Sequence, residues 1–303
     1  GCSSLNSIKI PEGVTSIGYS AFKECSSLNS IKIPKGVTSI GVDAFDGCDN
    51  LEPKLLVYDK GTKCYGWVGD KKKCTEVVIP KGVTSIGKWA FSGCSSLNSI
   101  KIPEGVTSIG EYAFSGCNSL EPKLLVYDKG TKCYGWIGNK EKCTDVVIPK
   151  GVTSIGESAF WWCRSLTSIK IPEGVTSIGE SAFWWCRSLT SIKIPKGVTS
   201  IGEYAFYDCR SLASIKIPEG VTSIGKSAFS GCERLTGINI PKSVTSIGDK
   251  AFEDCSSLTS INIPEGVKSI GDKAFSGCSS LTSINIPEGV TSIGKSAFSG
   301  CER

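Results

Sequence analysis

A 23-residue recurrence of one Ile-Pro pair constrains this chain more than any other feature of its sequence. A fixed period of about 20 to 50 residues indicates a small unit stacked on copies of itself, because each unit buries its apolar face against its neighbours. Two irregular segments occupy the places where the pair is missing, so the sequence predicts thirteen units. The eleven prolines of the series are Pro11, Pro34, Pro80, Pro103, Pro149, Pro172, Pro195, Pro218, Pro241, Pro264 and Pro287.

The repeat also predicts the domain organisation. A chain of 303 residues would ordinarily suggest about two globular domains, but a uniform repeat offers no place for a boundary between them. We therefore predict that residues 1–303 form a single continuous array, with irregular units at about 51–74 and 120–143. The last four residues, 300–303, copy residues 231–234, which lie inside a repeat. We accordingly expect the chain to be a fragment of a longer protein.

The regular unit, for which residues 189–209 serve as the example, alternates apolar and polar residues before its proline. Such alternation is typical of a short strand with one buried face, and the proline ends that strand. A glycine then permits a turn, and a second pair of inward apolar residues follows on the returning side of the unit. The Ala-Phe segment after it is too short for a stable helix. The sequence thus predicts a mainly β fold with short helical or 3-10 turns. The inward residues are Leu189, Ile192, Ile194, Val198 and Ile201.

The whole pattern, Leu-x-x-Ile-x-Ile-Pro-x-x-Val-x-x-Ile-Gly-x-x-Ala-Phe-x-x-Cys, resembles the BspA-type (Treponema pallidum-like) leucine-rich repeats. The resemblance extends over eleven regular units and so over nearly the whole chain. It implies a curved solenoid with a parallel sheet on the concave face, of the kind often found on bacterial or protist surface proteins concerned with adhesion. One fold hosts many binding surfaces, so the resemblance alone names no ligand.

Twelve of the sixteen cysteines follow the 23-residue period. Stacked positions hold neighbouring side chains parallel, whereas a disulfide needs two converging Cβ vectors, so these residues are predicted to be buried free thiols. Metal binding is disfavoured, because the chain has no histidine and no closely spaced cysteine pair. The twelve are Cys2, Cys25, Cys48, Cys94, Cys117, Cys163, Cys186, Cys209, Cys232, Cys255, Cys278 and Cys301.

The other four cysteines lie in the irregular units, which share one sixteen-residue segment at 52–67 and again at 121–136. Here we predict a disulfide between Cys64 and Cys74 and another between Cys133 and Cys143, with free thiols as the alternative. Such bridges would staple units that lack the usual apolar pattern. In strict register, Trp67 and Val68 replace the Ala-Phe pair of a regular unit.

Composition and motifs exclude several classes of function. The absence of histidine removes the commonest general base, and no glycine-rich phosphate-binding pattern is present, so we expect neither an enzyme nor a cofactor. A net charge of +5 with interspersed signs gives no reason to expect a nucleic-acid partner. No apolar run approaches the length of a membrane span, and no secretory signal is visible at the first residues.

The strongest local departure from the repeat is aromatic. Two adjacent units carry Trp-Trp where most have Ser-Gly, the next unit carries Tyr-Asp, and all three place an arginine after the cysteine. Stacking would gather these side chains into one exposed patch suited to protein contacts or to sugar rings. The alternative is that the indoles only cover the outer turn beneath the guanidinium groups. The candidate ligand-binding residues are Trp161, Trp162, Trp184, Trp185, Tyr207, Arg164, Arg187 and Arg210.

A second candidate surface is a row of outward lysines on successive strands, Lys170, Lys193 and Lys216, which we predict on the concave face. Three ammonium groups at about 4.8 Å spacing repel one another, and a polyanion such as a sulfated glycan would relieve that repulsion. The alternative is a solvated face that discourages edge pairing.

Together these features predict a non-enzymatic cell-surface or secreted scaffold that adheres to host or neighbouring-cell proteins or glycans. The alternative is a structural role, as a stretch of a long extracellular fibre formed by self-association of repeat arrays. An intracellular interaction module would be preferred if Cys64 and Cys74 were reduced in native material.

Overall fold

The computed structural model describes residues 1–301 and confirms the predicted solenoid of short β-strands and turns. The coils group into two compact units, each with its own stacked interior. Unit 1 comprises Gly1–Lys123, Tyr127–Lys129 and Ile137–Asn139, and unit 2 comprises Leu124–Val126, Gly130–Trp136 and residues 140–301. The division between them falls within the second irregular segment.

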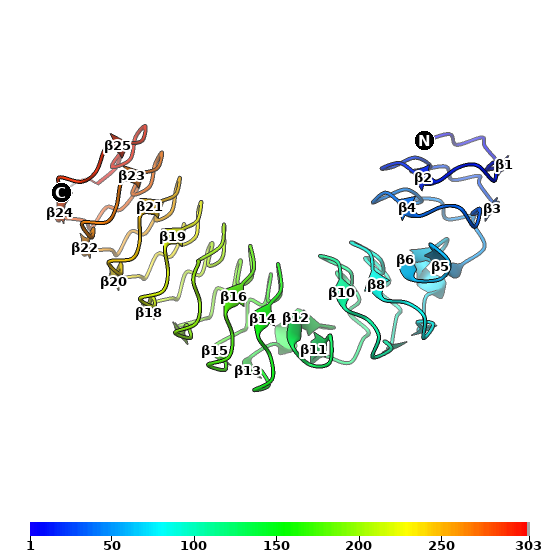
Figure 1. The fold of residues 1–303 in the computed structure, drawn as a ribbon, viewed down its shortest axis with the longest axis horizontal. Coiled ribbons are helices and arrows are strands. Elements are labelled where there is room, and N and C mark those ends of the chain that lie inside the picture. Colours follow the sequence, from blue (N-terminus) through cyan, green and yellow to red (C-terminus); the bar gives the residue numbers. More distant parts are fainter. Residues whose placement is uncertain (302–303) are drawn as a thin grey trace. The chain divides into compact units, whose positions relative to one another are not determined.

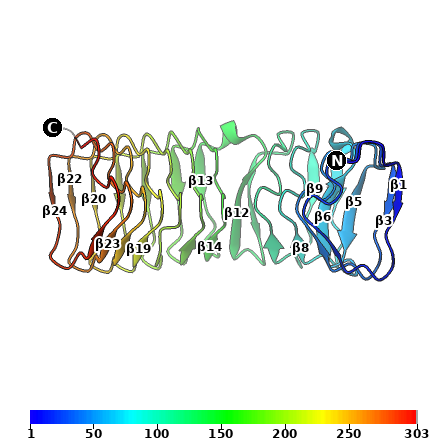
Figure 2. The same cartoon turned by 90° about the horizontal axis from the view of Figure 1, so that it is seen from above.

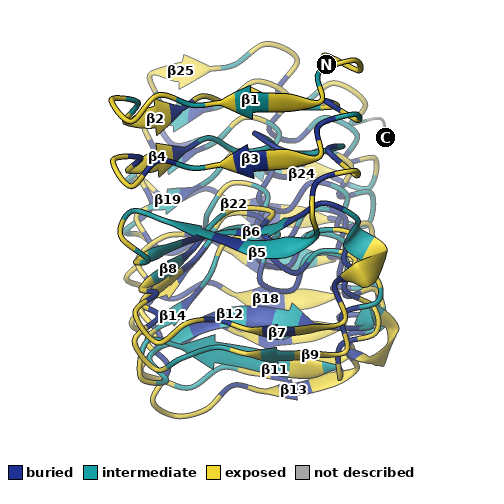
Figure 3. Cartoon of the chain, turned by 90° about the vertical axis from the view of Figure 1, so that its right-hand side faces the viewer, coloured by how far each residue is buried: buried dark blue, intermediate teal, exposed yellow. Residues whose placement is uncertain are grey.

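Each regular rung contributes one three-residue strand and one two-residue strand, apart from a single isolated bridge at Ile201. Strands of successive rungs pair in parallel at an offset of 23 residues, as in Ile215↔Ile238 and Ile224↔Ile247. In the three-residue strands the central isoleucine or valine points inward and its neighbours outward, which gives the exposed ends and darker centre of β3 in Figure 3. Figure 2 shows β20, β22 and β24 side by side along unit 2.

In unit 1 the three-residue strands are β1 (Ser7–Lys9), β3 (Ser30–Lys32), β7 (Glu76–Val78) and β9 (Ser99–Lys101). Its two-residue strands are β2 (Ser16–Ile17), β4 (Ser39–Ile40), β8 (Ser85–Ile86) and β10 (Ser108–Ile109).

In unit 2 the three-residue strands are β13 (Asp145–Val147), β15 (Ser168–Lys170), β17 (Ser191–Lys193), β18 (Ser214–Lys216), β20 (Gly237–Asn239), β22 (Ser260–Asn262) and β24 (Ser283–Asn285). Its two-residue strands are β14 (Ser154–Ile155), β16 (Ser177–Ile178), β19 (Ser223–Ile224), β21 (Ser246–Ile247), β23 (Ser269–Ile270) and β25 (Ser292–Ile293). Within unit 2, Figure 1 shows β18, β20, β22 and β24 along the outer edge of the stack and β19, β21, β23 and β25 along its inner edge.

The Ala-Phe segment forms the predicted turn and stacks directly on its copies. The backbone N–H of Phe160 donates to the carbonyl of Ala182 in the next rung at 2.7 Å. The rings of Phe160 and Phe183 lie parallel, with centroids 5.4 Å apart. Residues 23 apart are therefore vertical neighbours, as the period predicts.

The twelve cysteines that follow the 23-residue period, here called the ladder cysteines, are free thiols. All except the first and the last, Cys2 and Cys301, are buried, which confirms the prediction of buried free thiols for those positions. Each thiol from Cys186 to Cys301 lies near the carbonyl oxygen of the phenylalanine 26 residues earlier, as in Cys186 Sγ–H to Phe160 O at 3.2 Å. A small side chain that packs as a hydrophobe and also donates a weak hydrogen bond suits this turn.

The irregular segments fold as antiparallel hairpins, β5 (Lys54–Tyr58) with β6 (Lys63–Val68), and β11 (Lys123–Tyr127) with β12 (Lys132–Ile137). Each is followed by a 3-10 turn, η1 (Lys71–Lys73) or η2 (Lys140–Lys142). β6 joins the parallel sheet of unit 1 at an offset of 22 residues, with Cys64 opposite Ile86. The N–H of Trp67 donates to Ala90 O at 2.8 Å, so Trp67 takes the bond that phenylalanine makes in a regular rung. The strict-register prediction is thus wrong by one residue.

That shift explains why the predicted disulfides Cys64–Cys74 and Cys133–Cys143 are absent from the structure. Cys64 occupies the buried isoleucine position of a two-residue strand, whereas Cys74 lies 23 residues before Leu97 and occupies the leucine position. The thiol of Cys74 meets that of Cys94, and this hydrogen bond and burial together raise the pKa of Cys74. Each cysteine therefore replaces a separate aliphatic residue of the core. Cys133 and Cys143 repeat the arrangement, with Cys143 against Cys163.

Between residues 1 and 301, no helix has the length and apolar character that a membrane crossing requires. Nor does this part of the chain gather three or more cysteine or carboxylate groups in a way that would hold a metal ion.

Candidate ligand-binding surfaces

The eight predicted aromatic and arginine residues come together on the turn edge of three successive rungs in unit 2, and we call them the Trp/Arg cluster. Trp162 and Trp185 are vertical neighbours with ring centroids 4.1 Å apart. Trp161 lies 5.2 Å from Trp162, and the ring of Trp184 lies 5.4 Å from that of Tyr207. The stacking thus produces the cluster that the 23-residue period predicts.

The backbone explains how these side chains are presented. Trp162 and Trp185 both have φ of 63°, in the left-handed region where the Ser-Gly rungs place a glycine such as Gly231. A bulky residue in that conformation costs about 1 to 2 kcal/mol relative to glycine. The two N–H groups nevertheless keep the regular cross-rung bonds, Trp162 to Trp184 O at 2.9 Å and Trp185 to Tyr207 O at 2.8 Å.

Two of the three arginines place their guanidinium groups over indole rings. The guanidinium carbon of Arg164 lies 4.2 Å from the ring centroid of Trp162 and 5.3 Å from that of Trp185. Arg187 lies 5.0 Å from the Trp185 ring. Cation–π contacts of this kind contribute about 0.5 to 2 kcal/mol each, depending on desolvation.

Asp208, which the sequence did not single out, anchors this end of the cluster. It occupies the glycine position of the third rung, is buried, and accepts from Arg187 Nε and Arg210 Nε at 2.8 Å each. The hydrogen bond to Asp208 raises the pKa of Arg210 above its ordinary value. The sequence did contain a sign of this contact. The Tyr-Asp pair places a carboxylate one rung after Arg187, the second of two rungs that carry an arginine at the same phase.

The four tryptophans are half-buried, so the predicted patch is less exposed than a free aromatic platform. The Nε1 atoms of Trp184 and Trp185 are buried and have no hydrogen-bond partner in the part of the chain that the structure describes. An unpaired buried donor costs about 1 to 3 kcal/mol. The cluster therefore combines strained backbone, unsatisfied donors and aromatic rings in tilted or edge-to-face contact.

The lysine row is exposed, and Lys193 faces Lys216 directly across β17 and β18. Lys170 lies at the same phase on β15, where its registered partner on β13 is Val147. The row follows the outer edge of unit 2 in Figure 1, so the predicted concave position is wrong for these three residues. Glu173 accepts from Lys193 at 2.7 Å and supplies a counter-charge within the protein itself.

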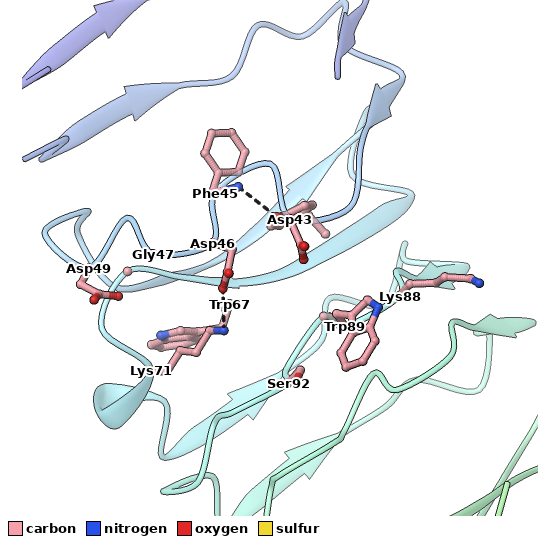
Figure 4. Close-up of a pocket in the computed structure, with 13 residues that line it drawn as sticks. Asp43, Phe45, Asp46, Gly47, Asp49, Trp67, Lys71, Lys88, Trp89 and Ser92 are labelled. Atoms are coloured by element: carbon pink, nitrogen blue, oxygen red, sulfur yellow. Dashed lines mark hydrogen bonds and ion pairs between the residues drawn. The ribbon is translucent and has the colours of Figure 1, made fainter. Parts of the chain in front are cut away.

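Unit 1 contains a site that the sequence did not reveal, a cavity of about 170 Å³ beside the hairpin β5–β6. Figure 4 shows Asp43, Asp46, Trp67 and Trp89 among the residues around it. These residues lie in three consecutive rungs, and the register shift of the hairpin brings them to one opening. We call this cavity the hairpin pocket.

The repeat and its turn-edge surface define a solenoid scaffold. The model of the BspA type leucine rich repeat region matches six copies at residues 1–56, 69–125, 138–259 and 246–303, and the chain belongs to this family. The two gaps in the match, 57–68 and 126–137, fall on the hairpins. No curated protein matches the sequence.

Solved structures of bacterial leucine-rich repeat proteins are similar to this chain. One from Bacteroides ovatus is 31% identical over 99% of this chain and 78% of its own, with a TM-score of 0.50. The Treponema pallidum leucine-rich repeat protein is 36% identical over 60% of this chain and 86% of its own, with a TM-score of 0.54. One from Eubacterium ventriosum is 26% identical over 98% of this chain and 82% of its own, with a TM-score of 0.65.

Proposed function

We propose that this protein is a non-enzymatic binding scaffold, displayed on a cell surface or secreted, which adheres to a protein of a host or neighbouring cell through the Trp/Arg cluster. The observation that carries the proposal is the cluster itself, in which four indoles and three guanidinium groups share one turn edge of unit 2. Tryptophan, tyrosine and arginine are the residues that most often dominate the free energy of protein binding.

The cost of the cluster to the fold supports a role in binding. Neighbouring rungs make the same turn with Ser-Gly, as at Ser230 and Gly231, so the solenoid does not need tryptophan here. The chain instead holds Trp162 and Trp185 in a conformation that favours glycine and leaves two indole donors unpaired. Backbone strain that the fold itself does not require is typical of functional sites.

The ion pairs within the cluster and the lysine row favour a protein partner over a polyanion. A sulfated glycan would need free cationic charge, yet Asp208 already engages Arg187 and Arg210, and Glu173 engages Lys193. A partner that offers an apolar side chain and a backbone carbonyl fits better, because it would cover the rings and accept from an indole N–H that turned outward.

The resemblance to surface proteins of this repeat class supports the proposed location outside the cell. The cysteines do not bear on it: Cys64 and Cys74 fill separate aliphatic positions, so reduced thiols at these two residues are compatible with either compartment.

Replacing Trp162 and Trp185 with glycine tests the proposal, because glycine is the residue that regular rungs carry at this phase. Wild type and variant are compared for binding to a panel of purified extracellular matrix and cell-surface proteins by surface plasmon resonance. We expect a member of the panel to bind wild type, and the variant to bind it at least about 100-fold more weakly, as for the loss of two hot-spot aromatics.

The matched control is Glu253→Ser with Asp254→Gly, which makes a regular Ser-Gly rung at the same phase, away from the cluster. This variant should bind like wild type. Equal binding by the glycine variant, or no binding across the panel, contradicts the proposal. Self-association of wild type that the glycine variant loses would instead favour the structural, fibre-forming role.

A further inference from the structure

The hairpin pocket exists because one rung of unit 1 lacks the regular turn. In regular rungs the N–H of each phenylalanine donates to a backbone carbonyl one rung further on, as Phe22 does to Ala44 O at 2.8 Å. Next to the hairpin that carbonyl is missing, and the N–H of Phe45 donates to the phenolic oxygen of Tyr65 at 3.1 Å instead. A side chain thus replaces a turn of backbone, and a cavity of about 170 Å³ remains beside it.

Trp89 supplies a flat apolar wall to this cavity. One face of its indole stacks on Tyr112 of the following rung, with centroids 4.5 Å apart and planes 29° from parallel. The preceding rung has the hairpin residue Gly66 near this point, whose ideal Cβ position would overlap the backbone of Ala90. No side chain of that residue therefore covers the indole, and Trp89 remains 42% exposed.

The polar groups of the pocket are close to electrically balanced. Asp46 pairs with Lys71 at 3.2 Å and with Lys23 at 3.7 Å, and Lys23 also reaches Asp43 at 3.4 Å. Figure 4 shows the ion pair of Asp46 with Lys71 and shows Lys88 extending away from Trp89. Carboxylate acceptors and ammonium donors thus lie at one opening without a large excess of either charge.

Tyr65 adds a hydroxyl donor. Its oxygen accepts from Phe45, and within residues 1–301 no acceptor is found for its own O–H. Burial raises the pKa of Tyr65 to about 12, so the phenol keeps this proton at neutral pH. A half-buried donor that lines a cavity is available to an acceptor on a ligand.

From this geometry we propose that the hairpin pocket binds a single neutral pyranose ring, such as a terminal sugar residue of a glycan. At about 170 Å³, the cavity is well below the roughly 300 Å³ of the smallest pockets for drug-sized molecules. A pyranose has an apolar C–H face that suits the open face of Trp89 and a rim of hydroxyls that suits Asp43, Asp46 and Tyr65.

Charged ligands fit the pocket less well. A basic side chain would compete with Lys23 and Lys71 for carboxylates that they already pair with, and a phosphate or sulfate would meet three aspartates, including Asp49. A neutral ring displaces no ion pair and can accept from the ammonium groups while it donates to the carboxylates.

The test is titration of the chain, residues 1–303, with methyl glycosides of common neutral hexoses, deoxyhexoses and N-acetylhexosamines, followed by indole N–H signals in NMR. The Trp89 signal is assigned by its loss in the Trp89→Ser variant, since serine is the residue at this phase in rungs such as those of Ser181 and Ser227. We expect one glycoside to shift the Trp89 signal saturably, with a Kd of about 1 mM.

Trp89→Ser should weaken that binding at least about tenfold, as read from the other pocket indole, Trp67. The control Lys250→Ser changes the same repeat phase in unit 2 and should leave the Kd unchanged. The proposal is overturned if no glycoside shifts Trp89, if Trp89→Ser retains the wild-type Kd, or if N-acetyl-lysine methylamide binds in place of the sugars. None of these variants touches the Trp/Arg cluster, so the two binding proposals stand or fall separately.

Discussion

At the scale of single residues, buried cysteines occupy two kinds of structural position in this chain. The ladder cysteines pack beside the phenylalanine column and donate to turn carbonyls, as Cys255 does to Phe229 at 3.2 Å. Cys64 and Cys133 instead take the place of an inward isoleucine in the rungs that contain a hairpin. Burial raises the pKa of Cys255 and of Cys64, so at these two positions the folded state holds the proton more tightly than the unfolded chain does.

The first prediction concerns alkaline stability. Burial raises the pKa of Cys64 and of Cys133 from 9.0 to about 12. Because the folded pKa is the higher one, the contribution of each thiol is intact below about pH 9 and is lost as the pH rises from there toward 12. The loss is about 1.4 kcal/mol of unfolding free energy per thiol and pH unit.

Urea unfolding at several pH values checks this prediction with the variant Cys64→Val with Cys133→Val, which restores an aliphatic side chain at the isoleucine position. We expect it to stay within about 1.5 kcal/mol of wild type at pH 7. Between pH 9 and 10 it should lose about 2 to 3 kcal/mol less than wild type. Parallel pH curves for the two proteins would show that these thiols do not titrate as described.

At the scale of elements, the hairpin rungs show how an irregular segment is accommodated in a periodic stack. β5 and β6 add an antiparallel pair, and the 22-residue offset from β6 to β8 is followed by a return to 23 between β7 and β9. Gly66 makes this possible, because its φ of 129° and its closeness to the backbone of Ala90 exclude any side chain. Gly66 thus allows the hairpin to pack against the backbone of Ala90, beside the pocket.

Alanine substitutions at two glycines of the same hairpin test that role. Gly66→Ala should lower the unfolding free energy by at least about 3 kcal/mol, since both the backbone conformation and the space oppose a Cβ. Gly61→Ala, at φ of 85° with no atom near its Cβ position, should cost only about 1 kcal/mol. The measurement is chemical denaturation of both variants; equal losses would place the constraint in the backbone angle alone.

The hairpins also mark the limit of prediction from the sequence. The period fixed which residues are vertical neighbours, and therefore the membership of the Trp/Arg cluster and the positions of Phe160 and Phe183. Lys63 pairs with Ser85 at an offset of 22 residues. This shift of one residue cannot be predicted from the sequence, because each irregular unit still has the length of one 23-residue repeat. For that reason the disulfide prediction for Cys64 and Cys74 was wrong and the hairpin pocket was not foreseen.

At the scale of the whole molecule, each unit carries its own candidate binding surface. Unit 2 presents the Trp/Arg cluster where three adjacent rungs depart from Ser-Gly, and unit 1 presents the hairpin pocket where one rung departs from the regular turn. In both cases a uniform stack provides a rigid frame, and a local change of sequence provides the chemistry.

The central claim is that residues 23 apart lie in direct contact and act together. A double-mutant cycle on unfolding free energies, with Trp162→Gly, Trp185→Gly and the double variant, measures that contact in solution. The two indoles, tilted by 50° with ring centroids 4.1 Å apart and both in contact with Arg164, predict a coupling free energy of about 0.5 to 1.5 kcal/mol. Additivity of the two single effects within about 0.3 kcal/mol would contradict the claim.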